Sequence, residues 1–263
     1  MLRPASGEIV EPAPVGLAAL GELLLAAAET LVAVKLVVHQ HPPSSRWTAE
    51  APQTMCLQRF QSTKNTVKPY DRSYFDRWYR DPDDRVATRE SLERKARMAI
   101  ALTEFLIGRK IRSVLDVGCG EAAWHRIVKR FRPNARYVGV DSSEYVLERF
   151  GASRNIRRGT LGTLGAMRLP RRIDLIVCAD VLQYAADAEV ARGLRAIRQL
   201  LGGVAYVEAF VTDDNMEGDR VGWHERTATE YARFFRDAGL TQCGPYCFVS
   251  LDELDSLNRF EHT

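Results

Sequence analysis

From about residue 68 onward, the chain alternates short apolar runs with amphipathic segments. Apolar or β-branched runs predict strands at 112–117, 136–140, 173–179 and 203–211, and a weaker one near 155–158. Apolar positions at helical spacing predict helices at 87–109, 122–131, 143–150, 187–201 and 227–238. Gly108 and Gly239 mark the ends of the first and last of these helices. Nearly continuous apolar strands that alternate with helices predict an α/β fold, a doubly wound and mostly parallel sheet with helices on both faces.

The N-terminal part follows a different pattern. Residues 15–38 are apolar for about the length of a membrane span, but two glutamates and a lysine interrupt them, and central charges are costly in lipid. This segment therefore predicts a helix that docks on a partner or on the rest of the protein. Residues 39–69 are polar, contain several prolines and show no period, which is typical of a linker or of disordered chain. We expect a leader at 1–66 and one domain at 67–263.

The stretch VLDVGCGEAA at 114–123 leads a predicted strand into a glycine-rich turn. Its spacing fits G-x-G-x-x-A, which in dinucleotide-binding proteins places a pyrophosphate on a helix N-terminus. Asp116 stands just before the first glycine, and two unit charges about 4 Å apart interact by roughly 4 kcal/mol at an effective dielectric near 20. The carboxylate therefore disfavours a phosphate and favours a ligand that presents an ammonium group. Gly118 and Gly120 let the backbone turn sharply and approach that ligand.

A second acid follows the next predicted strand. Asp141 ends the run YVGVD, where a carboxylate can accept both hydroxyls of an adenosine ribose. NAD-binding proteins share this feature, and Asp141 can also cap the helix expected near 143. Together with Asp116, it describes a small ligand with an amine at one end, a ribose at the other and no phosphate.

The segments VLDVGCG, VGVDSS and DLIVCADVLQY together resemble the cofactor motifs of class I S-adenosylmethionine-dependent methyltransferases. The resemblance covers roughly 110–240, with 68–109 in the place of the family's N-terminal lid. It implies S-adenosylmethionine as the cofactor. The methionine end would then be lined by Asp116, Gly118, Cys119, Gly120, Ala179 and Asp180, and the ribose by Asp141 and Ser142.

Two segments depart from the family pattern. Thr160 stands about where such enzymes often carry an acid near the adenine amino group, so adenine recognition would rest on Thr160 or on backbone groups. The tail LTQCGPYCFVS is short for the usual antiparallel strand pair. We therefore expect the last hairpin to be missing or truncated, and residues 252–260 to form a closing helix.

Methyl transfer from a sulfonium is an in-line displacement with an excellent leaving group, so the protein mainly has to align the reactants. A base is needed only where the acceptor must lose a proton. Tyr184, which closes DVLQY, and His224, in the polar stretch after the fifth strand, are the candidate catalytic residues. Glu208 inside that strand must find a partner or shift its pKa, and structural pairing and catalysis both stay open.

Two further features bear on the acceptor. The aromatic residues at 70–79 recur at helical spacing, so they either pack against the sheet or form a lid that excludes water and favours a cationic sulfonium. The acidic residues at 213–225 hint at a cationic or amine acceptor, and a solvated loop explains them equally well.

Composition narrows the functional classes. A net charge of +3 without a dense basic run gives no reason to expect a nucleic-acid partner. The 5 cysteines have no zinc-like spacing and fit a reducing cytoplasm. We predict a cytoplasmic methyltransferase for a small-molecule acceptor, with no metal and no membrane partner, and the oligomeric state is open. The alternatives are an NAD(P)-linked oxidoreductase and a non-catalytic cofactor-binding or structural domain of the same fold.

Overall fold

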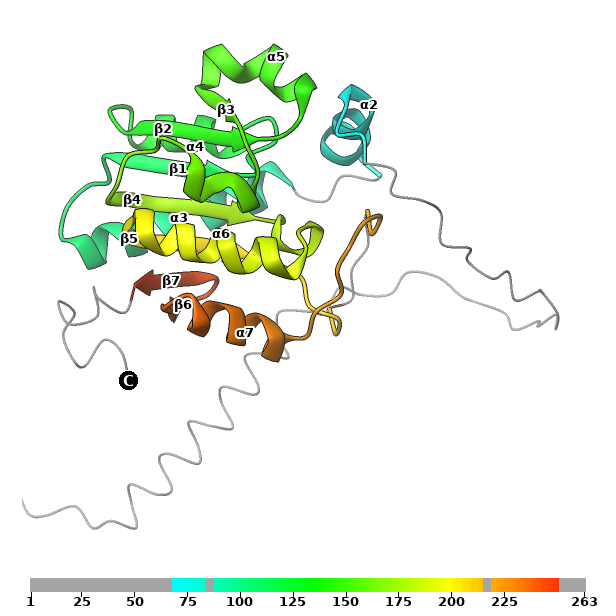
Figure 1. Ribbon diagram of the computed structural model, residues 1–263. Helices are drawn as coiled ribbons and strands as arrows, with labels where there is room; N and C mark the ends of the chain where they lie inside the picture. The colour runs from blue at the N-terminus through cyan, green and yellow to red at the C-terminus, as the bar shows by residue number, and fades with distance from the viewer. Residues whose placement is uncertain (1–67, 84–87, 215–218, 251–263) are drawn as a thin grey trace, which may run out of the picture. The chain divides into compact units, whose positions relative to one another are not determined.

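The computed structural model describes residues 68–83, 88–214 and 219–250. Over these residues the chain forms a seven-stranded sheet in the order β3-β2-β1-β4-β5-β7-β6, with helices on both faces (Figure 1). This confirms the predicted fold class. The expected leader at 1–66 and the closing helix at 252–260 lie outside the described residues, so the domain boundary stays a prediction.

The parallel part of the sheet contains the five strands that the apolar runs predicted. They are β1 (Ser113–Val117), β2 (Arg136–Asp141), β3 (Ile156–Arg158), β4 (Ile173–Ala179) and β5 (Leu201–Glu208). β5 begins and ends slightly earlier than its apolar run. The chain winds outward from β1 to β3 and then returns to β4 on the other side of β1. The switch point of the topology, where such sheets bind ligands, therefore lies between the ends of β1 and β4.

Of the two expectations for the last hairpin, that it is missing is wrong, because the hairpin is present with two short strands. β6 (Leu240–Gly244) and β7 (Cys247–Ser250) pair antiparallel, and β7 also pairs antiparallel with β5. Both strands are short, so periodicity gave a weak signal, yet β7 is buried along its whole length. Phe248 of β7 stacks on Phe235 with the ring centroids 3.9 Å apart. Contacts on the sheet therefore stabilise a hairpin that local pattern alone did not reveal.

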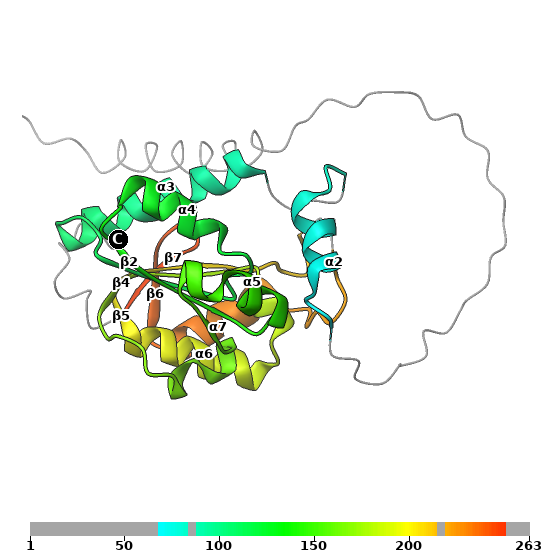
Figure 2. The ribbon, with the colours of Figure 1, turned by 90° about the horizontal axis from the view of Figure 1, so that it is seen from above.

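The helices divide between the two faces of the sheet (Figure 2). One face carries α3 (Arg89–Ile107), α4 (Ala123–Phe131) and α5 (Glu144–Arg154), and the other carries α6 (Asp187–Leu200) and α7 (Ala228–Asp237). Gly108 and Gly239 both have positive φ at the ends of α3 and α7, as predicted. No helix within the described ranges is long and apolar enough to cross a membrane.

Shorter elements surround the carboxyl ends of the strands. They are α2 (Arg72–Phe75), the π-helical turn η1 (Asp76–Arg80), and the 3-10 turns η2 (Leu161–Ala166) and η3 (Leu182–Tyr184). α2 lies beyond the carboxyl ends of the parallel strands in both ribbon views (Figures 1 and 2). The fold thus brings the strand ends, η3 and the segment that begins at Lys68 to one edge of the sheet.

Candidate functional site

The turn after β1 depends on two glycines. Gly118 and Gly120 have φ of 66° and 51°, in the left-handed region that favours glycine. A Cβ at Gly118 would overlap the side chain of Val181, which follows β4. A Cβ at Gly120 would lie 2.9 Å from the hydroxyl of Tyr79 in η1. The backbone of the turn therefore lies so close to Val181 and to η1 that a side chain at either glycine position would collide with them.

Asp141 ends β2 and supports this turn. Its Oδ2 accepts a hydrogen bond from the Gly120 N–H at 2.7 Å, and its Oδ1 accepts one from the Ser143 N–H at 2.9 Å. Ser143, and not Asp141, caps α5, because the Ser143 hydroxyl accepts from the Val146 N–H. Burial raises the pKa of Asp141, against the hydrogen bonds that lower it. The carboxylate thus lies at the glycine turn with both oxygens already oriented.

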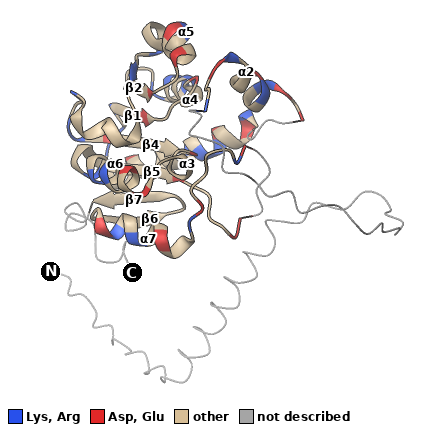
Figure 3. Cartoon of the chain, turned by 45° about the vertical axis from the view of Figure 1, so that its right-hand side comes forward, with Lys and Arg blue, Asp and Glu red and all other residues tan. Residues whose placement is uncertain are grey.

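Asp116 lies at the end of β1, and acidic residues mark the ends of both β1 and β2 (Figure 3). Its carboxyl is buried and accepts a hydrogen bond from the Tyr137 hydroxyl at 2.6 Å. Burial raises the pKa of Asp116 to about 7, although the Tyr137 hydroxyl opposes the rise. A buried carboxylate that accepts only one hydrogen bond is stabilised in its charged form by a nearby cation.

The predicted cofactor residues line two adjoining cavities at this edge. The first, of about 350 Å³, is lined by Gly118, Gly120, Asp141, Ser142, Thr160, Ala179 and Asp180 among others. The second, of about 570 Å³, is lined by Asp116, Cys119 and, again, Gly118, Ala179 and Asp180. The structure therefore brings together residues that the sequence distributes over four strand ends. Tyr79 borders both cavities.

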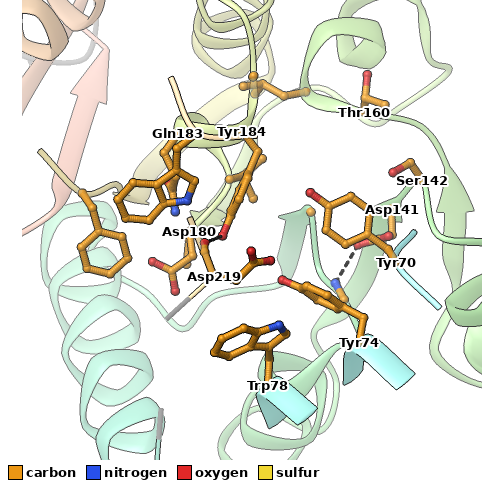
Figure 4. A pocket seen from close by; sticks show the side chains of 18 of the residues that line it. Tyr70, Tyr74, Trp78, Asp141, Ser142, Thr160, Asp180, Gln183, Tyr184 and Asp219 are labelled. Atoms are coloured by element: carbon orange, nitrogen blue, oxygen red, sulfur yellow. Dashed lines mark hydrogen bonds between the residues drawn. The ribbon is translucent and has the colours of Figure 1, made fainter. Parts of the chain in front are cut away.

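Aromatic rings form much of the wall of the first cavity (Figure 4). Tyr70, Tyr74, Phe75 and Trp78 reach it from the N-terminal segment, and Phe75 is also buried and stacks on Tyr145 with centroids 5.5 Å apart. The segment thus packs on the domain through Phe75 and also lines the cavity, whereas its role as a lid stays a prediction.

Thr160 lies at the wall of the first cavity but has a second task. Its hydroxyl accepts a hydrogen bond from the Thr163 N–H at 3.3 Å, and the Thr160 N–H donates to the Thr163 hydroxyl at 2.8 Å. This capping box starts η2. The Thr160 side chain is therefore partly engaged within the protein.

Asp180 stands on the border of both cavities. Its backbone has a left-handed φ of 60°, and its N–H donates to the Glu208 carbonyl at 2.9 Å. Although Asp180 is exposed at the cavities, desolvation by the surrounding protein raises its pKa to about 7, and the charge of Glu208 adds to the rise. Glu208 itself is paired, since it accepts from Lys95 Nζ at 2.6 Å and from the Tyr206 hydroxyl at 2.8 Å. Of the two roles left open for Glu208, the structure thus supplies the pairing.

The two predicted catalytic residues have different surroundings. Tyr184 lines the first cavity, and its hydroxyl donates to the Asp219 carbonyl at 2.8 Å. His224 is exposed, lines neither cavity, and donates its backbone N–H to the Gln183 carbonyl at 2.7 Å. The structure brings Tyr184, and not His224, to the cavity. Their catalytic roles stay predictions.

Sequence reasoning missed several wall residues of the first cavity. Gln183, Phe210 and Trp223 line it, and the rings of Phe210 and Trp223 stack with centroids 6.0 Å apart. Gln183 lies within the quoted motif DVLQY, but its direction depends on the η3 turn. Within the described ranges, no three His, Cys, Asp or Glu side chains converge as a metal site requires.

Comparison with known proteins adds independent information. A sequence profile described as a methyltransferase domain matches residues 115–203. A search of curated protein sequences gives no match.

Solved structures share the fold. One is a SAM-dependent methyltransferase from Archaeoglobus fulgidus, with a TM-score of 0.50 and 14% identity over 65% of this chain and 74% of that chain. Another, from Galdieria sulphuraria, is provisionally assigned as a sarcosine dimethylglycine methyltransferase and has a TM-score of 0.50 and 18% identity over 65% of this chain and 74% of that chain. Identities this low show a common fold and nothing finer. The chain therefore carries a methyltransferase domain at residues 115–203, within a fold that it shares with S-adenosylmethionine-dependent methyltransferases.

Proposed function

We propose that this protein transfers the methyl group of S-adenosylmethionine to a small-molecule acceptor. The observation that carries the proposal is that the glycine turn, the Asp141 carboxylate and a set of aromatic walls meet at one cavity of about 350 Å³. Concave sites with apolar walls and a few oriented polar groups are typical of small-molecule binding. The cytoplasmic location stays a prediction that rests on the cysteines.

The residues at the site fit this cofactor. Gly118 and Gly120 keep the backbone of the turn free of side chains beside the first cavity, and Gly118 does so beside the second as well. Each oxygen of Asp141 accepts one backbone hydrogen bond and has capacity for another, so the two ribose hydroxyls can both donate to it. Asp116 supplies negative charge in the second cavity. The ammonium of the methionyl end would be stabilised most by electrostatic attraction there. Since Thr160 is engaged in the η2 cap, adenine recognition would depend more on backbone groups there.

When bound, S-adenosylmethionine supplies a methyl group activated by its sulfonium. The chain has to exclude water and to hold the acceptor in line with that group, and alignment of this kind contributes several kcal/mol, on the order of 7–11 in favourable cases. The rings of Tyr74, Trp78 and Tyr184 provide apolar walls for this purpose. Asp180, with a pKa of about 7 on the border of both cavities, is suited to accept a proton from the acceptor near neutral pH.

Calorimetric titration of the full-length protein with S-adenosylhomocysteine and with NAD⁺ tests the cofactor. We expect binding of S-adenosylhomocysteine and no heat with NAD⁺, because the carboxylates at the turn oppose a pyrophosphate. The opposite result would favour the NAD(P)-linked oxidoreductase.

Incubation with methyl-labelled S-adenosylmethionine and a panel of small acceptors then tests the transfer. The panel should hold amines, alcohols, phenols, thiols and carboxylates, so that the class of acceptor is read directly. Label in an extracted product is the expected result. Tight cofactor binding without label in any product would instead identify a non-catalytic cofactor-binding domain.

A further inference from the structure

Lys68 places its ammonium among three tyrosine rings. Lys68 Nζ lies 4.2 Å from the ring centroid of Tyr184, 5.1 Å from that of Tyr74 and 5.3 Å from that of Tyr70. It also forms an ion pair with Asp219, and the Lys68 and Asp219 side chains are only 13% and 9% exposed. We refer to Tyr70, Tyr74, Tyr184 and Asp219 as the cation box.

The cation box is part of the wall of the first cavity. All four of its residues line that cavity, and Figure 4 shows Tyr70, Tyr74, Tyr184 and Asp219 around a common space. Ring faces and a carboxylate attract the same kind of ligand, because both present negative potential to a cation. The box is therefore built for a positive charge, and a lysine of the same chain supplies that charge.

Other contacts hold the box in shape. The Tyr70 carbonyl accepts from the Ser143 hydroxyl at 2.5 Å, which links Tyr70 to the start of α5. The Tyr184 hydroxyl donates to the Asp219 carbonyl, and Asp219 Oδ1 accepts from the Val221 N–H at 3.0 Å. The rings and the carboxylate are thus oriented by bonds that do not involve Lys68.

A buried polar atom next to the box lacks a partner. Gln183 is 1% exposed, lines the first cavity, and its Oε1 finds no hydrogen-bond partner among the described residues. Buried acceptors are nearly always paired, so an unpaired one in a cavity wall indicates a ligand that donates. An N–H or O–H group on a bound molecule would satisfy it.

We propose that the cation box is the subsite for an alkylammonium group of the methyl acceptor, and that Lys68 fills it when no acceptor is bound. This inference rests on the proposed function, since it names the chemical class of the acceptor. A protonated or quaternary nitrogen has no lone pair, so the methyl-accepting atom is a second group of the same molecule.

Charge balance favours this occupant over others. When an alkylammonium replaces Lys68, Asp219 keeps a cationic partner and no buried charge is left alone. A neutral molecule in the box would leave the Asp219 carboxylate unpaired, which is strongly unfavourable for a buried group. An anion would meet Asp219 together with Asp141 and Asp180, which line the same cavity.

Titration of the full-length protein, saturated with S-adenosylhomocysteine, tests the proposal. The probes are choline and its uncharged isostere 3,3-dimethyl-1-butanol. In Lys68→Met the affinity for choline should rise about 10- to 100-fold, as expected if Lys68 fills the box about 90–99% of the time. Within Lys68→Met, choline should bind about tenfold or more tightly than the isostere, because only choline gives the Asp219 carboxylate a cationic partner. Lys110→Met, which alters an exposed lysine outside the cavity lining, is the matched control and should leave both affinities unchanged.

A second substitution identifies the source of the gain. Asp219→Asn, added to Lys68→Met, should cancel most of the increase for choline, because the carboxylate is removed. Equal affinities of choline and its isostere for Lys68→Met would mean that the substitution merely opened an apolar void. Unchanged choline affinity in Lys68→Met would mean that Lys68 only tethers its segment to Asp219. Either result overturns the cation box.

Affinity for S-adenosylhomocysteine, measured first on every sample, separates the two proposals. Intact cofactor binding with no choline preference overturns the cation box alone, whereas a wild-type chain that does not bind S-adenosylhomocysteine overturns the proposed function. If Lys68→Met does not fold, the wild-type protein carries the test. Choline, and not its isostere, should then shift the indole N–H resonance of Trp223, and no shift overturns the proposal.

Discussion

Replacing Asp116 with asparagine should stabilise the cofactor-free protein at about pH 8. The carboxyl is 3% exposed, and burial raises its pKa from 3.8 to about 7. Between these values the folded state holds a proton that the unfolded state has released, so wild-type stability falls as the pH rises from about 4 to about 7. At about 1.4 kcal/mol per pH unit, the ionised carboxylate costs about 4 kcal/mol.

Asparagine has nearly the same shape, and its carbonyl oxygen can still accept the hydrogen bond from Tyr137. We expect Asp116→Asn to exceed wild type in free energy of unfolding by about 2 kcal/mol at pH 5 and by about 4 kcal/mol at pH 8. The same change should weaken binding of S-adenosylhomocysteine at pH 8, because the negative charge that favours its ammonium is gone. Stability and cofactor affinity should thus move in opposite directions.

Urea unfolding followed by tryptophan fluorescence measures this difference across the pH range. Asp237→Asn, which alters an exposed carboxylate at the end of α7, controls for the change in net charge and should show no widening gap. If the free energies of unfolding of Asp116→Asn and wild type differ by the same amount at pH 5 and at pH 8, burial of an ionised Asp116 is not what limits stability.

Three other substitutions test separate parts of the site. Asp141→Asn should weaken S-adenosylhomocysteine binding about 10- to 100-fold in calorimetry, because a hydrogen bond to a charged group contributes about 1.5–3 kcal/mol. Gly118→Ala should lower the free energy of unfolding by more than about 2 kcal/mol in urea, because its Cβ would overlap Val181 from a left-handed backbone. Arg226→Met should cost about 2–4 kcal/mol by the same assay, because the Leu182 and Ala185 carbonyls lose the buried guanidinium that donates to them.

Each of these has a matched control. Glu144→Gln alters an exposed carboxylate at the start of α5 and should leave cofactor affinity unchanged. Gly108 has a similar φ of 67°, but a Cβ added there would have no atom near it. Gly108→Ala should therefore lower the free energy of unfolding by only about 1 kcal/mol. Arg94→Met, whose side chain is exposed, should stay within about 0.5 kcal/mol. If both glycine variants, or both arginine variants, lose the same free energy of unfolding, the arguments from local packing are wrong. If Asp141→Asn binds S-adenosylhomocysteine as tightly as wild type, the assignment of Asp141 to the ribose is wrong.

Much of the α/β order could be predicted because its signals are local. The apolar periodicity of α6 and the β-branched run of β4 are set by neighbouring residues, and Gly108 ends α3 through its own backbone freedom. The last hairpin could not be predicted in this way. β7 is four residues long and is stabilised by β5, which precedes it by about forty residues. Pairing of that kind is decided by burial on the sheet rather than by a local pattern.

For the site, the sequence determined which residues follow the strands. Parallel strands bring their carboxyl ends to one edge, so Asp116, Asp141 and Asp180 had to come near one another once the sheet formed. Only the tertiary structure decided which way the side chains point. Lys68, Tyr184 and Asp219 lie far apart in the chain, and no spacing relates them, yet packing of α2 and η3 against the strand ends brings them into one box. The order of most strands and helices along the chain follows from local patterns, whereas a contact between distant side chains depends on the packing of the whole domain.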